Sequence, residues 1–270
     1  MRGSSRAAAA AGEKALEAAF TAGADRRTLA EELLSVTAVV DGSATLRRAL
    51  ADPSRESGEK QALAERLLSG KVSAEALVVV KALVGQRWAT ERDLSDTLEE
   101  LGIESLLAAA ESGGRIDRVE DELFRFERIV AGNPELRDRL TNRQGDVQDK
   151  AGVVNQLLEN RAADETQRLA RQAVLAPRGR KLDRTLEHYL SLAAKRREQV
   201  TAVVTAATEL TAQQRERLTA ALQNIYGKTV LLQVVLDEQV IGGIRVQVGD
   251  EVVDGTVLRR LDEARRHISG

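Results

Sequence analysis

The stretch VIGGIRVQVGDEVVDGTV, residues 240–257, decides the fold class because it departs from the helix-forming composition of the rest of the chain. Residues 244–248 alternate between apolar and polar side chains, which is the period of a strand with one buried face. The glycine pair at 242–243 permits a tight reversal or bulge, and Gly-Asp at 249–250 is a hairpin signal. These glycines and acids could form a phosphate loop, a metal site, or a strand-turn-strand without any ligand.

The neighbouring segments extend this stretch into a small α/β domain, residues 199–270. The β-branched run VTAVVTAAT at 200–208 and the apolar run TVLLQVVLD at 229–237 predict strands. Between them, residues 210–227 have helical periodicity and open with the Thr-x-x-Gln pattern of a capping box. Residues 257–268 return to a helical pattern.

Upstream of this domain, the chain repeats itself at an offset of 90 residues. The segment LRRALAD at 46–52 aligns with LRDRLTN at 136–142, and similar pairs continue on both sides without a gap. A shared register of this length indicates a duplicated unit. We therefore expect a mainly α protein with two tandem helical-bundle domains, a first copy at 1–102 and a second copy at 103–198, followed by the α/β domain.

Each copy is predicted to contain several short helices. The first long apolar face in each copy stops at Gly42 or Gly132, which we expect to be left-handed helix ends. Ser43 and Asn133 are expected to cap the next helix, with Pro134 in its first turn. Further helices are expected at 58–68, 73–86 and 91–101 in the first copy, and at 148–159, 163–176 and 181–197 in the second.

The composition excludes several classes of function. With 40 basic and 42 acidic side chains the formal net charge is −2, so no global field attracts nucleic acid. The chain has no cysteine, which excludes disulfides and thiolate chemistry. No stretch approaches the roughly 20 apolar residues of a membrane span, so we expect membrane contact only through another subunit.

The candidate enzymatic motifs are weak. Gly-Lys-Thr at 227–229 resembles the end of a phosphate loop, but position 222 holds Leu222 instead of glycine, and the expected order is helix then strand. His188 and His267 stand alone on expected helices, without a nucleophile beside them. We expect no catalytic residue, no metal and no cofactor. The acids that could otherwise bind a hard cation lack calcium-loop spacing; they are Asp237, Glu238, Asp250, Glu251 and Asp254.

The closing block VVLDEQVIGGIRVQVGDEVVDGTVLRRLDEAR, residues 234–265, resembles the C-terminal signature of the delta subunit of bacterial F-type ATP synthases. That family is related to the mitochondrial oligomycin-sensitivity-conferring protein. The shared elements are Asp237 before a short apolar turn, the Ile-Gly-Gly step at 241–243, an alternating strand to Gly249, a Val-Val-Asp-Gly turn at 252–255, and a closing basic helix. The resemblance assigns a structural role to the turn residues Gly242, Gly243, Gly249, Asp254 and Gly255.

The resemblance extends upstream. Residues 210–233 are similar to the helix and strand that precede this signature, and 105–126 and 136–161 are similar to the N-terminal domain of the family. The first copy, 1–102, resembles a second N-terminal domain of the kind found in some actinobacterial versions of the subunit.

The family resemblance implies a non-catalytic role. The delta subunit joins the catalytic head to the peripheral stalk and keeps the head from turning with the rotor during ATP synthesis and proton transport. The implied location is peripheral, on the cytoplasmic side of the cell membrane. From the residues alone, a generic helix-binding adaptor in another assembly is the alternative, followed by an enzyme that uses residues 227–229.

The resemblance also implies two protein partners and no nucleic acid. In the family, an N-terminal helix of an alpha subunit lies in a groove between the first and fifth helices of the N-terminal bundle, and the C-terminal ends of b-type stalk subunits contact the C-terminal domain, here 199–270. The groove in the second copy would be lined by Leu106, Leu107, Ala110, Leu169, Ala173 and Val174. A possible second groove in the first copy would be lined by Leu16, Ala19, Phe20, Val79, Ala82 and Leu83.

Overall fold

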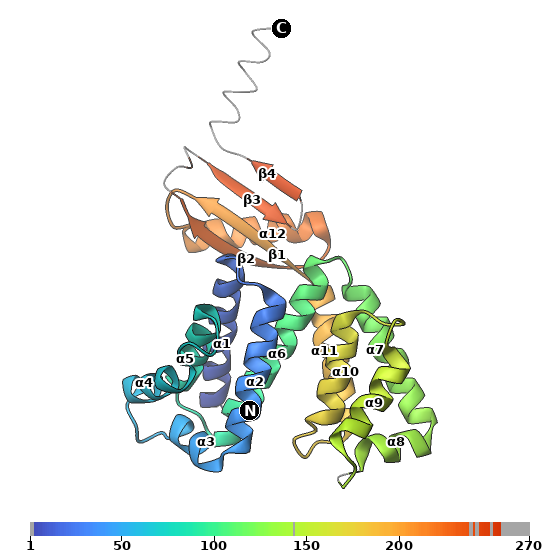
Figure 1. Cartoon of the computed structure of the whole chain (residues 1–270). Coiled ribbons are helices and arrows are strands. Elements are labelled where there is room, and N and C mark those ends of the chain that lie inside the picture. Colours follow the sequence, from blue (N-terminus) through green and yellow to red (C-terminus); the bar gives the residue numbers. More distant parts are fainter. Residues whose placement is uncertain (1–2, 143, 238–239, 241–242, 249–250, 255–270) are drawn as a thin grey trace. The chain divides into compact units, whose positions relative to one another are not determined.

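The computed structural model describes residues 3–142, 144–237, 240, 243–248 and 251–254. Over these residues it contains twelve helices and a four-stranded sheet near the C-terminus, so the expected fold class is confirmed (Figure 1). The chain separates into two compact units, Met1–Ala194 and Lys195–Gly270. Each unit has a hydrophobic interior of its own.

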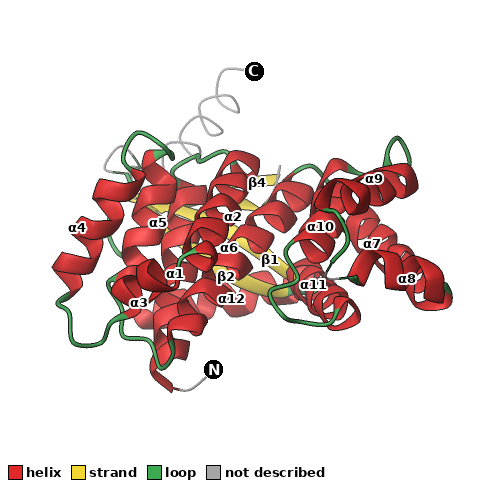
Figure 2. Ribbon diagram, turned by 60° about the horizontal axis from the view of Figure 1, so that its bottom comes forward, coloured by secondary structure: helices red, strands yellow, loops and turns green. Residues whose placement is uncertain are grey.

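The first unit contains helices joined by short loops (Figure 2). Its helices begin and end close to the expected positions, with one exception described below. They are α1 (Gly3–Thr21), α2 (Arg26–Gly42), α3 (Ala44–Ala51), α4 (Ser57–Leu68), α5 (Ala74–Val84), α6 (Glu91–Ser112), α7 (Ile116–Gly132), α8 (Pro134–Thr141), α9 (Val147–Leu158), α10 (Asp164–Leu175) and α11 (Leu182–Arg197), the last of which extends three residues beyond the unit.

The internal repeat is visible in the helix bounds. The bounds of α2, α3 and α4, each shifted by 90 residues, coincide with those of α7, α8 and α9. Equivalent hydrogen bonds accompany the equivalent helices. Glu32 Oε1 accepts from the backbone N–H of Ser73 at 2.9 Å, and Glu122 Oε2 accepts from the N–H of Ala163 at 2.8 Å. Each bond satisfies one of the unpaired N–H groups at a helix start.

The exception is α6, which was expected to end at 101 but continues without a break to Ser112. Its first half is therefore the last helix of the first copy, and its second half is the first helix of the second copy. Gly102, at the centre, allows α2 to pack close to α6. A Cβ on Gly102 would lie only 2.8 Å from Cγ of Leu34 and 3.5 Å from the carbonyl oxygen of Ala30.

The expectation of left-handed helix ends at Gly42 and Gly132 is wrong. Both glycines are the last residues of their helices, and neither has a positive φ. A single extended residue, Ser43 or Asn133, ends one helix and starts the next, so a left-handed residue is not needed. The expected caps are confirmed, because Ser43 Oγ accepts from the N–H of Leu46 and Asn133 Oδ1 from the N–H of Leu136, with Pro134 in the first turn as expected.

Two hydrophobic clusters fill the first unit, and Leu, Val and Ala dominate both, as the low aromatic content indicates. One fills the first copy, includes Leu33 and Val79, and also takes in Ala108 from the second half of α6. The other fills the second copy and also takes in Ala30 and Leu34, which belong to α2 of the first copy. At about 1.5–3 kcal/mol for each fully buried large aliphatic side chain, the two clusters supply most of the stabilisation of this unit.

The second unit combines one helix with a mixed sheet in the order β2-β1-β3-β4. β1 pairs parallel with β2, and β3 pairs antiparallel with both β1 and β4. Ala202 and Val204 on one face of the sheet share a hydrophobic cluster with Leu222 of the helix. The elements are β1 (Gln199–Ala206), α12 (Ala212–Tyr226), β2 (Thr229–Leu236), β3 (Ile244–Val248) and β4 (Glu251–Asp254).

Most of the local features that the sequence predicts for this unit are confirmed. Thr211 and Gln214 form the expected capping box of α12, and Gly227 ends the helix in the left-handed conformation with φ +64°. The expected turn at 252–255 is wrong for its first three residues, which form β4, because Val252 and Val253 pair with β3. The expected helix at 257–268 lies outside the described residues.

Candidate functional site

The six residues predicted to line the groove of the second copy lie together in one hydrophobic cluster on α6 and α10. None of their side chains is exposed by more than 3%. Ala30 and Leu34 of α2 belong to the same cluster. A helix of the first copy therefore already packs against the α6–α10 pair.

Ion pairs fix α2 in this position. Arg27 donates through Nη1 to Asp164 at 3.1 Å and through Nη2 to Glu165 at 2.8 Å. One helical turn further along α2, Glu31 accepts from Nε of Arg168 at 2.7 Å. The apolar pair and the flanking charges together give α2 the character of an amphipathic helix docked on its neighbour.

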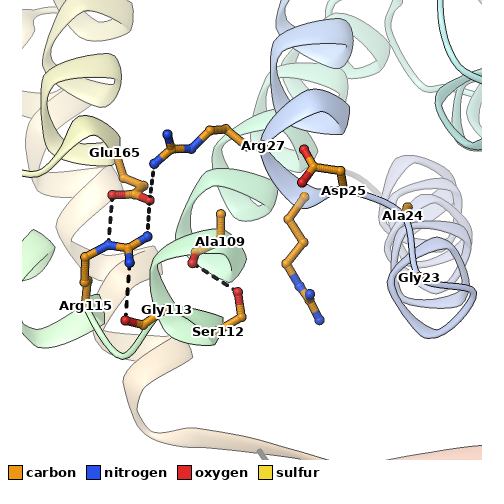
Figure 3. Close-up of a pocket in the computed structure, with 10 residues that line it drawn as sticks. Gly23, Ala24, Asp25, Arg27, Ala109, Ser112, Gly113, Arg115 and Glu165 are labelled. Atoms are coloured by element: carbon orange, nitrogen blue, oxygen red, sulfur yellow. Dashed lines mark hydrogen bonds and ion pairs between the residues drawn. The ribbon is translucent and has the colours of Figure 1, made fainter.

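Glu165 is the most perturbed carboxyl of this contact. Its side chain is 1% exposed, and it accepts from Arg27 and, at 2.7 Å, from Nη2 of Arg115 (Figure 3). Burial alone would raise the pKa of Glu165, but the hydrogen bonds from Arg115 and Arg27 lower this pKa to about 2. Glu165 therefore stays ionised near neutral pH and serves as neither a proton donor nor a base.

A polar pocket of about 600 Å³ opens beside Glu165, between the turn after α1 and the end of α6 (Figure 3). Arg26 packs over the ring of Phe20 at 5.1 Å, while Arg27 and Arg115 are paired with Glu165. Two of the three arginines that line the pocket are thus paired with an acid of the pocket. Its lining residues are Gly23, Ala24, Asp25, Arg26, Arg27, Ala109, Ser112, Gly113, Arg115 and Glu165.

The residues predicted for the groove of the first copy lie on α1 and α5. Leu16, Ala19, Phe20, Val79 and Leu83 are buried in the first hydrophobic cluster, and Ala82 is half-buried. On the adjacent turn of α5, Val78 is 59% exposed. Val78 is the equivalent, at the offset of 90 residues, of Arg168, which pairs with α2 in the second copy.

The motif at 227–229 does not have the geometry of a phosphate loop. Gly227 closes α12 instead of opening a helix, and the strand β2 follows it. In the part of the chain that the structure describes, no cluster of three acids or histidines could hold a metal ion. Likewise, none of the described helices is long and apolar enough to cross a membrane.

The structure places two of the five predicted turn residues. Gly243 has φ +112°, a conformation that favours glycine, and Asp254 ends β4. The pairing of Val248 with Glu251 leaves only positions 249 and 250 for the connection between β3 and β4. Gly242, Gly249 and Gly255 lie outside the described residues.

Comparisons with known proteins show which sequences this chain is similar to. The family model of the ATP synthase delta (OSCP) subunit matches residues 104–268. The ATP synthase subunit delta of Kineococcus radiotolerans is 45% identical over 269 residues, which cover 99% of this chain and 98% of that protein. The chain belongs to the ATP synthase delta (OSCP) family. The subunit delta proteins of Streptomyces griseus and Streptomyces coelicolor are each 45% identical and span 100% of this chain.

Because these relatives match over the whole length, the delta family here includes the duplicated helical region as well as the segment that the family model covers. The protein is a peripheral-stalk subunit of the F-type ATP synthase, and the alternative of an adaptor in an unrelated assembly is wrong. It links the catalytic head to the stalk, is peripheral to the membrane and is not itself catalytic.

Proposed function

We propose that this delta subunit contacts N-terminal helices of alpha subunits through its helical copies, 1–102 and 103–198, and b-type stalk subunits through residues 199–270. We further propose that it does so on the cytoplasmic side of the cell membrane. The proposal is supported by the family assignment and by the division of the chain into a helical unit and a sheet unit. Two compact units with different surfaces suit a protein that joins two different partners.

The first copy is the better candidate for the alpha-subunit contact. In the second copy, α2 packs against the α6–α10 pair and supplies both the apolar and the charged contacts. The equivalent pair in the first copy, α1 and α5, presents the exposed Val78 where the second copy has an ion-paired arginine. A helix bound in the second groove would have to displace α2 and its ion pairs.

The contacts of α2 also indicate the chemistry of the partner helix. In the second copy, the acid Glu165 receives an arginine from α2. Its equivalent in the first copy is the exposed Glu75. A partner helix that docks on α1 and α5 in the same way carries a basic residue opposite Glu75 and an apolar residue opposite Val78.

Two valine-to-arginine substitutions test the groove between α1 and α5, and the two valines have similar solvent exposure. Val78 and Val39 are 59% and 56% exposed, and Val39 lies on α2, away from the α1–α5 pair. A labelled peptide of about 20 residues from the N-terminus of the alpha subunit, enough for a 30 Å helix, is titrated against both variants. Val78→Arg should weaken binding about tenfold or more, because it places a charge in an apolar contact, whereas Val39→Arg should not.

Equal affinities for the two variants would remove the first groove from consideration. The second groove is tested separately with Arg168→Glu, which repels Glu31 and loosens α2. If this change strengthens peptide binding while Val78→Arg has no effect, the alpha-subunit helix uses the second groove.

For the stalk contact, we propose the face of the sheet that is opposite α12. Val203 and Val235 on this face are only half-buried, and Val252 is 46% exposed. Val252 pairs with Gln247 of β3, whereas its neighbour Val253, 55% exposed, pairs with Val246 and therefore points to the side of α12. Gln247 lies between Val203 and Val252 on this face, so the face presents separate valines with polar residues among them. Such a mixed surface is suited to an amphipathic helix from the stalk.

Neighbouring valines provide the control for this contact. Val252→Arg should reduce co-purification with the b-type subunits, because its side chain is on the proposed face, and Val253→Arg should leave it unchanged. The reverse result would place the stalk on the side of α12.

A further inference from the structure

The loop between α10 and α11 inserts a side chain between helices of the other copy. Arg178 in this loop has φ +52°, an uncommon conformation for a residue other than glycine. Its side chain is only 6% exposed. The strained backbone and the burial of a charge are both unfavourable, so the contacts of Arg178 must compensate for them.

These contacts reach two helices of the first copy. Arg178 donates through Nη1 to Glu99 at 2.8 Å and through Nη2 to Ser95 at 2.7 Å, and Nη2 forms an ion pair with Asp96 at 2.9 Å. All three partners are on α6. It also forms a bidentate pair with Asp41 at the end of α2, through Nε and Nη2. One guanidinium of the second copy thus holds α2 and α6 together.

The carboxylates around Arg178 make the loss of its positive charge unfavourable. Burial opposes its charge, but the hydrogen bond to Asp41 and the charges of Glu99, Asp41 and Asp96 raise its pKa above the usual value for arginine. Glu99 is 2% exposed and also accepts from Arg180. Without Arg178, the carboxylates of Asp41, Asp96 and Glu99 would lose the cation that they share, while Glu99 would keep its bonds from Arg180 and Gln172.

Arg178 acts at the opposite end of α2 from Glu165. Arg27, in the first turn of α2, pairs with Glu165, and Asp41, in the last turn, pairs with Arg178. Because these two ion pairs lie at opposite ends of α2, they prevent a rotation of α2 relative to the second copy that a single ion pair would allow. The shared helix α6 joins the copies covalently, but one helix can bend.

We propose that Arg178 is a latch that fixes the orientation of the first copy relative to the second, so that α2 and the second copy move as one rigid body. The chemistry required is a buried, multidentate guanidinium, which a lysine at the same position would reproduce only in part. This inference concerns the helical unit alone and does not depend on which partner binds to it.

The chain has no cysteine, so the latch can be tested by spin labelling at two introduced cysteines. Val39 on α2 and Ile129 on α7 are exposed by 56% and 51% and occupy equivalent positions in the two copies. In the full chain carrying Val39→Cys and Ile129→Cys, pulsed electron paramagnetic resonance should give one narrow distribution of distances between the two spin labels. Arg178→Gln should broaden or shift this distribution, and Arg178→Lys should give an intermediate width.

Arg137→Gln, on the exposed surface of α8, is the control and should leave the distribution narrow. If Arg178→Gln does not fold, Asp41→Asn provides the second test, because it detaches only α2 and leaves the contacts of Arg178 with α6 in place. Broadening with Asp41→Asn supports the latch. A distribution as narrow as that of the control in every folded latch variant would overturn it.

Discussion

Replacing Glu165 by Gln should destabilise the helical unit strongly and in a pH-dependent manner. The side chain is 1% exposed and its pKa falls from 4.5 to about 2 on folding. At about 1.4 kcal/mol for each tenfold change in proton affinity, the ionised form contributes about 3 kcal/mol at pH 7. Glutamine keeps the shape of the side chain but removes the charge that Arg27 and Arg115 bind.

The sign of the pH dependence follows from the lowered pKa. The stabilisation is fully present above the unfolded-state pKa of 4.5 and is lost as the pH falls through the folded-state value of about 2. The difference in unfolding free energy between wild type and Glu165→Gln should therefore shrink from about 3 kcal/mol at pH 7 to about 1.5 kcal/mol at pH 3.

Urea unfolding at both pH values measures this difference. The single tryptophan, Trp88, is buried in the first copy and reports on that copy by fluorescence, while circular dichroism reports on all helices. Glu75→Gln is the matched control, since Glu75 is the exposed equivalent of Glu165 in the first copy, and it should change the free energy by about 0.5 kcal/mol or less. A destabilisation by Glu165→Gln that is the same at pH 7 and pH 3 would refute the reasoning.

Three other changes have defined outcomes. Gly102→Ala should lower the melting temperature, because a Cβ 2.8 Å from Leu34 Cγ costs more than the roughly 1 kcal/mol gained in helix propensity; an unchanged or higher melting temperature would contradict this. Gly227→Val should destabilise the sheet unit by about 1–2 kcal/mol through its left-handed conformation, as measured by urea unfolding of the full chain. A protein lacking residues 1–102 should aggregate in light scattering, because the deletion cuts α6 in its middle and uncovers Leu106; a monodisperse protein would contradict this expectation.

Much of the fold could be predicted from the sequence because the relevant signals are local. Capping residues such as Ser43 and Thr211 act within one helical turn, and the period of residues 244–248 is that of a strand. The register of the duplication fixed the helix bounds of the second copy once those of the first were known. These signals do not require knowledge of distant contacts.

The joining of the two copies could not be predicted in the same way. Nothing local at Gly102 distinguishes a helix break from a position that allows close packing, and the outcome depends on Leu34, 68 residues earlier. Arg178 gave only a weak signal, an arginine between Pro177 and Gly179 in a short loop. Its acidic partners come from two helices that are distant in the sequence, so their convergence depends on the tertiary fold.

The candidate groove illustrates the same limit. The family resemblance grouped the apolar residues on α6 and α10, and these residues share one hydrophobic cluster. Neither the resemblance nor the helical spacing reveals which side of a helix another helix covers. α2 has a second apolar stripe, Ala30 and Leu34, beside the charged residues Arg27 and Glu31. That stripe was the available indication that α2 packs against two neighbours.

The shared helix α6 places a constraint on how this protein can evolve. Two domains joined by a flexible linker tolerate insertions and deletions in the linker, but each residue added to a continuous helix rotates everything beyond it by about 100° and moves it by about 1.5 Å. One extra residue near the centre of α6 would thus turn α7 and α10 away from α2 and separate Glu165 from Arg27. We therefore expect lineages with the duplicated bundle to keep the length of α6 constant while the loops around α3, α4, α8 and α9 vary in length.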